Sequence, residues 1–146
     1  QHTKKSEEEI REIVHNKLHL VGLDNVEAMM PNNLSGGMKK RVSLARAIAL
    51  EPQVILYDEP TAGLDPLRSM DINHLIVNTQ RQLHTTSVVV THDMESAFYV
   101  ADRLAYLEEG EFRLIADKET FRSTTDAQVQ RFIHGSTDWQ EGGNTT

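Results

Sequence analysis

Residues 34–65 read LSGGMKKRVSLARAIALEPQVILYDEPTAGLD, and this stretch decides the fold. A helix that starts at Gly36-Gly37 is followed by an apolar strand from Val54 to Tyr57, which ends in the paired carboxylates Asp58 and Glu59. The backbone amides at such a helix start can bind an anion, and parallel sheets bind ligands beyond the carboxyl ends of their strands. The stretch therefore predicts an α/β fold that binds the phosphates of a nucleotide.

Helices are predicted on the amino-terminal side of this strand. Ser6 and Glu9 form a capping box, which predicts a helix from about residue 7 to 20 that stops at Gly22. A second helix is predicted from Gly36 to Leu50, ending at Glu51-Pro52. Its apolar residues are expected to be buried (Val42, Ala45, Ile48, Ala49) and its basic residues solvated (Lys39, Lys40, Arg41).

Two continuous apolar runs predict the sheet. Val54 to Tyr57 and Ser87 to Val90 are expected to be central parallel strands, covered on both faces, with a helix from about Pro66 to Leu83 between them. A helix near residues 94–101, a hairpin of strands 103–107 and 112–115 around Glu109-Gly110, a short helix and a last helix near 126–134 follow. From Gly135 on, with Gly142-Gly143, we expect a frayed tail.

The composition limits the classes of protein that the chain can represent. Its 146 residues are enough for one domain, and with 38% hydrophobic residues no apolar run is long enough to cross a bilayer. The N-terminus does not have the pattern of a secretory signal, and the absence of cysteine fits the cytoplasm. A net charge of −7 argues against binding to duplex DNA, which requires clustered cations. We therefore expect a soluble protein without a nucleic-acid partner.

The candidate site residues follow the two strands. Asp58 is expected to hold Mg²⁺ through water and Glu59 to polarise an attacking water, while His92, which follows the second strand, is expected near a γ-phosphate. Ser35, Gly36 and Gly37 would offer backbone amides to an anion.

Each of these residues also has a structural alternative. Ser35 is an ordinary helix-capping residue, and a carboxylate after a strand can cap the next helix. Asp65 precedes Pro66 at a predicted helix start, which favours a capping role for its side chain, and Asp93 can cap the helix after His92. A single histidine is more often structural than functional.

Taken together, these segments resemble the C-terminal half of an ABC-type ATPase. Leu34-Ser35-Gly36-Gly37-Met38 is similar to the signature loop of the family, and Val54 to Glu59 resembles its Walker B strand with the catalytic glutamate. Ala62-Gly63-Leu64-Asp65 resembles the D-loop, and His92 the switch histidine. The four motifs stand in the family's order, and the resemblance runs from about residue 6 to 134. It implies a P-loop NTPase-like (RecA-like) parallel sheet flanked by helices.

The resemblance implies a role for each motif. Two cassettes face each other head to tail, and each ATP lies between the phosphate loop of one and the signature loop of the other. Leu34, Ser35, Gly36 and Gly37 would then meet an ATP held by a second ATP-binding subunit, and Asp65 would bridge the dimer. Asp58 would order Mg²⁺, Glu59 would be the general base and His92 would hold the γ-phosphate.

The finer resemblance is to the ATPases of Mla-type, Mce-associated lipid transporters. It rests on Met38 in place of the usual glutamine, on the segments 61–66 and 91–94, and on the ending Gln130 to Gly135. It implies transport of phospholipid or a related lipid, transmembrane permease subunits as partners, and a cytoplasmic location on the inner membrane through those partners.

One part of the family pattern is absent from the sequence. No G-x-x-x-x-G-K-[ST] phosphate loop occurs, so we expect the chain to lack half of the ATP site and the N-terminal half of the fold, and to be inactive alone. The expected regions are then part of the helical subdomain (1–33), the signature loop and α/β core (34–116), and the C-terminal helices and tail (117–146). An exposed apolar surface should remain where sheet neighbours are missing.

Two other functions are compatible with the same motifs. Signature and Walker B segments also occur in chromosome-organising and DNA-repair ATPases, although those carry a long coiled coil before the signature loop and here only one helix of about four turns precedes it. The chain could also be a non-catalytic module that donates a signature loop to a complete partner.

Overall fold

The computed structural model describes residues 5–135, and the chain divides into two compact units, Gln1–Val100 and Ala101–Thr146. The predicted division into regions 1–33, 34–116 and 117–146 follows family motifs, and it stays a prediction. The tail predicted after Gly135 lies outside the described residues. Among residues 5–135, no helix is both long enough and apolar enough to cross a membrane.

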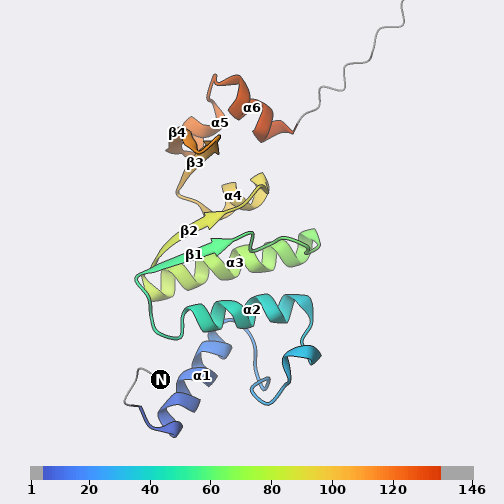
Figure 1. The fold of residues 1–146 in the computed structure, drawn as a ribbon, viewed down its shortest axis with the longest axis vertical. Coiled ribbons are helices and arrows are strands. Elements are labelled where there is room, and N and C mark those ends of the chain that lie inside the picture. The colour runs from blue at the N-terminus through green and yellow to red at the C-terminus, as the bar shows by residue number, and fades with distance from the viewer. Residues whose placement is uncertain (1–4, 136–146) are drawn as a thin grey trace, which may run out of the picture. The chain divides into compact units, whose positions relative to one another are not determined.

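The first unit begins with the predicted capped helix, α1 (Glu7–Leu20) (Figure 1). The capping box is confirmed, because the Ser6 hydroxyl accepts a hydrogen bond from the Glu9 amide at 3.3 Å and the Ser6 amide donates to the Glu9 carboxylate at 2.6 Å. A 3₁₀ turn, η1 (Pro31–Asn33), then leads through Leu34 and Ser35 into α2 (Gly36–Ala47).

Helix α2 ends earlier than the sequence predicts, at Ala47 instead of Leu50. The chain tightens there: the Ala49 amide bonds to the Arg46 carbonyl and the Glu51 amide to the Ile48 carbonyl. Glu51 itself has φ +51°, a left-handed conformation that takes the chain out of the helical path before Pro52.

The basic side of α2 also differs from its prediction, since Lys40 and Arg41 are half-buried. The Arg41 guanidinium donates to the Val21 carbonyl at 2.8 Å, and the Lys40 ammonium donates to the Glu59 carbonyl at 3.2 Å. Long basic side chains can cover apolar surface with their stems while the charged ends reach carbonyl oxygens, and periodicity alone does not reveal this.

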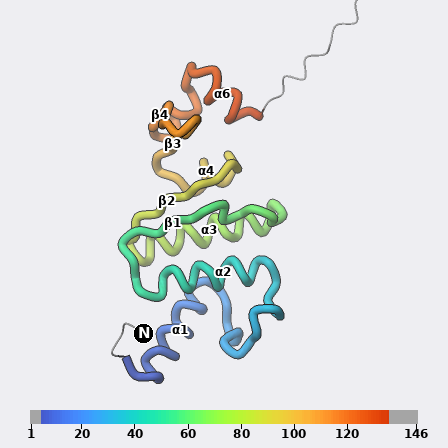
Figure 2. Tube along the Cα trace, viewed as in Figure 1, coloured from blue at the N-terminus to red at the C-terminus, as the bar shows by residue number. Residues whose placement is uncertain are grey.

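Strands β1 (Val54–Asp58) and β2 (Thr86–Val90) pair in parallel, with Asp58 opposite Val90 (Figure 2). Helix α3 (Pro66–Leu83) connects them, as predicted, and α4 (Met94–Val100) follows β2. The α/β class and the parallel pairing are confirmed. Among the described residues β1 pairs with β2 alone, so the central position of these strands stays a prediction.

The two strands are covered on one face only within the described part of the chain. Ile55 is 4% exposed and packs in a core with Leu44 of α2 and Leu75 of α3, whereas Leu56 is 76% and Val90 59% exposed. The expectation of cover on both faces was therefore wrong for residues 5–135. The predicted exposed apolar surface is confirmed.

The second unit is a hairpin with two helices. Strands β3 (Arg103–Glu108) and β4 (Glu111–Asp117) are antiparallel around the predicted turn at Glu109-Gly110, and α5 (Lys118–Arg122) and α6 (Ala127–His134) follow. Its buried apolar residues come from both strands and both helices: Leu104, Ala116, Phe121 and Val129.

Candidate functional site

Glu59 and His92 meet at the carboxyl edge of the parallel strands. Glu59 directly follows β1, and His92 lies two residues after the end of β2. The Glu59 amide donates to the Val90 carbonyl at 2.9 Å, which extends the strand pairing by one hydrogen bond. Glu59 Oε1 accepts a hydrogen bond from the His92 amide at 3.0 Å and lies 2.8 Å from His92 Nδ1. Thr91 Oγ1 donates to the other carboxylate oxygen, Oε2, at 3.4 Å. The sequence predicted this juxtaposition of Glu59 and His92.

The backbone of Glu59 turns sharply to make these contacts. Its φ is +45°, in the left-handed region that costs a residue other than glycine about 1–3 kcal/mol. The turn is held at both backbone groups, because the amide bonds to Val90 and the carbonyl accepts from Lys40. The conformation directs the carboxylate away from the course of β1 and toward the loop that follows β2.

The two side chains shift each other's protonation. The hydrogen bond from His92 lowers the pKa of Glu59, and the same hydrogen bond, with the negative charge of Glu59, raises the pKa of His92. The His92 side chain is 77% exposed and that of Glu59 33%. Solvent therefore screens the attraction between the two side chains. Near neutral pH Glu59 is therefore an ionised carboxylate engaged by an imidazole.

Asp58 lies at the same edge but does not join this contact. It is the last residue of β1, it is exposed, and its carboxylate makes no hydrogen bond or ion pair with another described residue. Successive strand residues point to opposite faces, and Glu59 turns away, so the paired carboxylates separate. Within residues 5–135 no group of three or more histidine, aspartate or glutamate side chains is arranged to hold a metal ion. A single free carboxylate suits Mg²⁺, which keeps several waters and takes further ligands from phosphates.

The glycine-rich loop is open. The Ser35 hydroxyl accepts a hydrogen bond from the Met38 amide at 3.2 Å and so caps α2, which confirms the structural alternative for this residue. A Cβ atom added at Gly36 or Gly37 would meet no atom within 4 Å from outside the adjoining turn of the helix, so there is open space beside both glycines. Within the described residues, no hydrogen bond or ion pair joins Leu34, Ser35, Gly36 or Gly37 to Glu59 or His92.

Comparison with known proteins places this geometry in a family. The sequence profile of the ABC transporter family matches residues 1–62. The probable ribonucleotide transport ATP-binding protein mkl of Mycobacterium leprae is 42% identical over 135 residues, which are 92% of this chain and 39% of that protein. The intermembrane phospholipid transport system ATP-binding protein MlaF of Haemophilus influenzae is 40% identical over 138 residues, which are 94% of this chain and 52% of that protein.

A solved structure agrees with these relatives. The protein cbiO1 from Clostridium perfringens, part of the ABC transporter complex cbiONQ, matches with a TM-score of 0.77 and 36% identity over 84% of this chain and 49% of that one. The chain belongs to the ABC-type ATPases. The chain spans about two fifths to half of the length of the curated relatives it matches.

Asp65, which the sequence predicted at the junction of two subunits, has a local role in the structure. Its Oδ1 accepts a hydrogen bond from the Arg68 amide at 3.0 Å and its Oδ2 lies 3.3 Å from Arg68 Nε, so it caps α3 as the structural alternative predicted. Its side chain remains half-exposed. Asp93 likewise caps α4 through its Oδ1, which accepts from the amides of Glu95 and Ser96.

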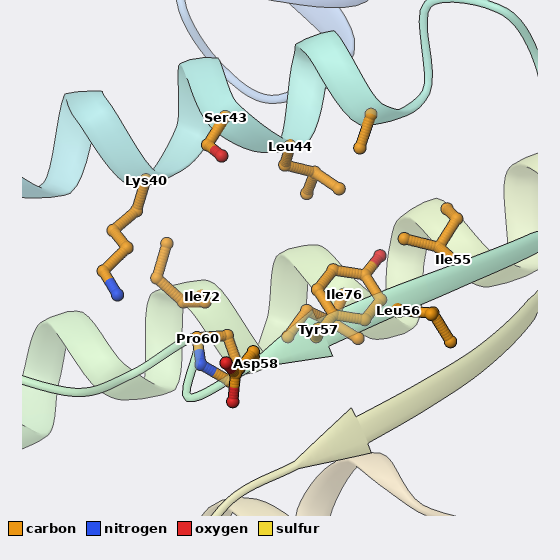
Figure 3. A pocket seen from close by; sticks show the side chains of 11 residues that line it. Lys40, Ser43, Leu44, Ile55, Leu56, Tyr57, Asp58, Pro60, Ile72 and Ile76 are labelled. Atoms are coloured by element: carbon orange, nitrogen blue, oxygen red, sulfur yellow. The ribbon is translucent and has the colours of Figure 1, made fainter.

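Lys40 also lies at this edge, where the sequence analysis predicted only a solvated basic side chain. Figure 3 shows its side chain extending from α2 toward the end of β1, where Asp58 and Pro60 lie. A cavity of about 180 Å³ lies between α2, β1 and α3, with mostly apolar walls and with Lys40 and Asp58 as its charged residues. The basic run 39–41 was visible in the sequence, but which of its members turns inward depends on how α2 packs.

Proposed function

We propose that these residues belong to an ATP-binding subunit of an ABC transporter and supply the hydrolytic side chains of one ATP site and the signature loop of another. One observation carries this proposal, namely the contact of Glu59 with His92 at the carboxyl edge of two parallel strands. A base and a phosphate-sensing imidazole from neighbouring strands meet there, where folds of this class bind ligands.

The contact also indicates how the base is released. While His92 holds Glu59 Oε1, the pKa of the carboxylate is lowered and its basicity is weakened. A γ-phosphate oxygen competes for the same imidazole, and when His92 turns to that oxygen, Glu59 regains basicity and can take a proton from the attacking water. Phosphoryl transfer depends mainly on positioning and charge neutralisation, so this exchange of partners would couple binding to catalysis.

Mg²⁺ would be held through water by Asp58, whose carboxylate has no partner among the described residues. When bound, the ion neutralises charge on the phosphate oxygens. Leu34, Ser35, Gly36 and Gly37 would contact the ATP of a second ATP-binding subunit, and Asp65 would lie at the junction of the two subunits. The open space beside Gly36 and Gly37 supports this assignment.

The phosphate loop, in this proposal, precedes residue 1 in a longer protein. The length of the relatives supports it, since the chain spans 39% of the mkl protein and 52% of MlaF. The exposed side chains of Leu56 and Val90 support it as well, because further sheet and helix elements would cover them.

The proposed cargo is phospholipid or a related lipid, delivered through transmembrane permease subunits that hold the ATPase dimer on the cytoplasmic face of the inner membrane. The name of the MlaF relative supports a lipid, and an Arabidopsis thaliana relative, 40% identical over 156 aligned residues, is named after trigalactosyldiacylglycerol. Other relatives are named for ribonucleotide, sulfate or methionine transport. Transport of labelled phospholipid and of methionine by the reconstituted complex would separate these cargoes.

The central test is Glu59→Gln in the complete ATPase that contains these residues. The substitution keeps the size and hydrogen bonding of the side chain but removes its basic carboxylate, so hydrolysis should fall by about 10²-fold or more while ATP binding is retained. Phosphate release and equilibrium nucleotide binding measure the two quantities. Unchanged hydrolysis would show that Glu59 is not the base. The 146-residue chain by itself should not hydrolyse ATP, and magnesium-dependent hydrolysis that Glu59→Gln abolishes would contradict the split site.

A further inference from the structure

A buried polar contact joins helices α3 and α4. Asn73 of α3 is 1% exposed and Ser96 of α4 is 2% exposed, and the Asn73 side-chain amide donates to the Ser96 hydroxyl at 2.8 Å. An amide or hydroxyl that loses its partner in such a place pays the full cost of desolvation. The contact therefore favours one arrangement of α4 against α3.

Ser96 is also linked to Glu59, through the loop that follows β2. The Ser96 hydroxyl donates to Asp93 Oδ2 at 2.6 Å, and the Asp93 amide donates to Thr91 Oγ1 at 3.0 Å. The Thr91 hydroxyl in turn donates to Glu59 Oε2 at 3.4 Å. Each hydroxyl uses its single proton once and accepts once, so the hydrogen bonds run in one direction from Asn73 to Glu59.

Asp65 lies at the start of α3 and caps its first turn. Asn73 lies eight residues after Asp65, about 12 Å along the axis of a continuous helix. Asp65 and Asn73 are joined by a continuous helix, so a displacement of its first turn would be passed to Asn73 and, through Ser96, to the loop 91–93. None of these contacts requires a residue outside the first compact unit.

We propose that Asn73 and Ser96 are positioning residues that hold the loop of Thr91, His92 and Asp93 against Glu59 and link this loop to the D-loop end of α3. The inference rests on the proposed function, in which Glu59 is the base and Asp65 lies at the subunit junction. Docking of a second cassette at Asp65 then acts on the orientation of His92 without a direct contact to it.

If Asn73 and Ser96 only stabilised the fold, their variants would lose activity only in proportion to the loss of folded protein. Helix α3 also offers a matched control. Thr79 is also 1% exposed, and its hydroxyl has no hydrogen-bond partner among the described residues. Thr79→Val therefore changes a buried polar side chain of the same helix without touching the path to Glu59.

The experiment compares variants of the complete ATPase by kcat, KM, ATP binding and thermal unfolding. Ser96→Ala should lower kcat by about tenfold, because a small displacement of a catalytic group is sufficient for such a loss, while KM and ATP binding stay within about twofold. Ser96→Thr, which keeps the hydroxyl, should recover most of the rate. Asn73→Leu should act like Ser96→Ala, and the double variant should be no slower than the slower single variant, as expected for residues that act as a unit.

Thr79→Val should leave kcat unchanged. The inference is overturned if Ser96→Ala keeps its full kcat, or if it loses activity only in proportion to a loss of folded protein. Because Asn73→Leu places an apolar side chain opposite a buried hydroxyl and can unfold the region, the Ser96 pair decides the result. Glu59→Gln is measured in parallel: if that variant stays active, the proposed function has failed, whereas an inactive Glu59→Gln with a fully active Ser96→Ala refutes only the positioning role.

Discussion

The edge that carries Glu59 and His92 and the glycine-rich loop of residues 34–38 differ in how many contacts hold them within the chain. At the edge, Glu59 is contacted by Thr91, His92 and Lys40, so its backbone and both carboxylate oxygens have partners inside the chain. At the loop, the Ser35 side chain caps α2 and has no other hydrogen bond within residues 5–135, and a Cβ atom at Gly36 or Gly37 would meet nothing within 4 Å outside the adjoining helix turn. The edge is held by contacts within the chain, whereas the loop is held only by its cap on α2 and leaves open space beside its glycines.

This difference separates two kinds of mutational effect. A change at the edge disturbs a network within one chain, so its effect should stay with the ATP site of that chain. A change at the loop should leave its own chain intact and act on whatever docks there. In the head-to-tail arrangement that we propose, a loop variant and an edge variant therefore damage different sites of a mixed dimer.

The largest expected effect tests this separation. Ser35→Arg places a long cation over the loop and should lower hydrolysis by the complete ATPase about 10²-fold, similar to Glu59→Gln. A mixed dimer of one Ser35→Arg and one Glu59→Gln subunit keeps one site with an intact base and an intact facing loop. Its activity should recover to about half of the wild-type value, measured on dimers purified through two different tags.

Homodimers of each variant serve as controls, and both should stay inactive. If the mixed dimer were as inactive as the homodimers, the loop and the base would act on the same ATP within one chain. The difference between edge and loop would then have no functional meaning.

The sequence predicted that Glu59 and His92 meet, but it did not predict the hydrogen bonds that shape the backbone at Glu59. Glu59 and His92 follow two apolar runs of strand length, and parallel strands bring their carboxyl ends together, so their meeting was predictable from spacing alone. The left-handed turn at Glu59 and its separation from Asp58 were not, because they depend on hydrogen bonds to Val90 and Lys40. The prediction that both faces of the strands are covered was also wrong for residues 5–135. A continuous apolar run shows that a strand can be buried, but it does not show whether the covering elements lie within these residues.

Asn73 and Ser96 show a further limit of sequence analysis. In the sequence they are an ordinary polar residue in a helix and a serine near a helix start, and only the packing of α3 against α4 makes them partners. The D-loop and signature positions were read correctly as helix starts, and the structure confirms the caps at Ser35 and Asp65.

A smaller effect is expected for the residue that joins the two regions. Lys40→Met keeps the length and apolar stem of the side chain but removes the hydrogen bond to the Glu59 carbonyl, and Lys39→Met, at an exposed position of the same helix, is the matched control. Lys40→Met should lower kcat by about tenfold or less, because the left-handed turn at Glu59 loses one of its three backbone hydrogen bonds and keeps those to Val90 and Ala62. Lys39→Met should be neutral. Equal effects of the two variants would mean that the charge of α2 matters and its contact with Glu59 does not.

The smallest expected effect is the pH dependence of the Glu59–His92 contact. Because the pKa of Glu59 is lowered from 4.5 and the pKa of His92 is raised from 6.5, the pair contributes to stability fully between these two values. This contribution is lost as the pH rises through the raised pKa of His92, and also as it falls through the lowered pKa of Glu59. Asp93, whose pKa is lowered too, adds to the shift of His92 and stays ionised across this window.

His92→Gln isolates the contribution of the histidine charge to stability, because glutamine can still donate a hydrogen bond but carries no charge. In the complete ATPase without nucleotide, the difference in chemical denaturation midpoint between wild type and His92→Gln should be largest between pH 4.5 and 6.5 and should shrink toward pH 9. Added salt should reduce it as well, since the His92 side chain is 77% exposed and open to counterions. A difference that does not change with pH would show that the contact acts through its hydrogen bonds alone, and the edge would then be held by geometry without help from charge.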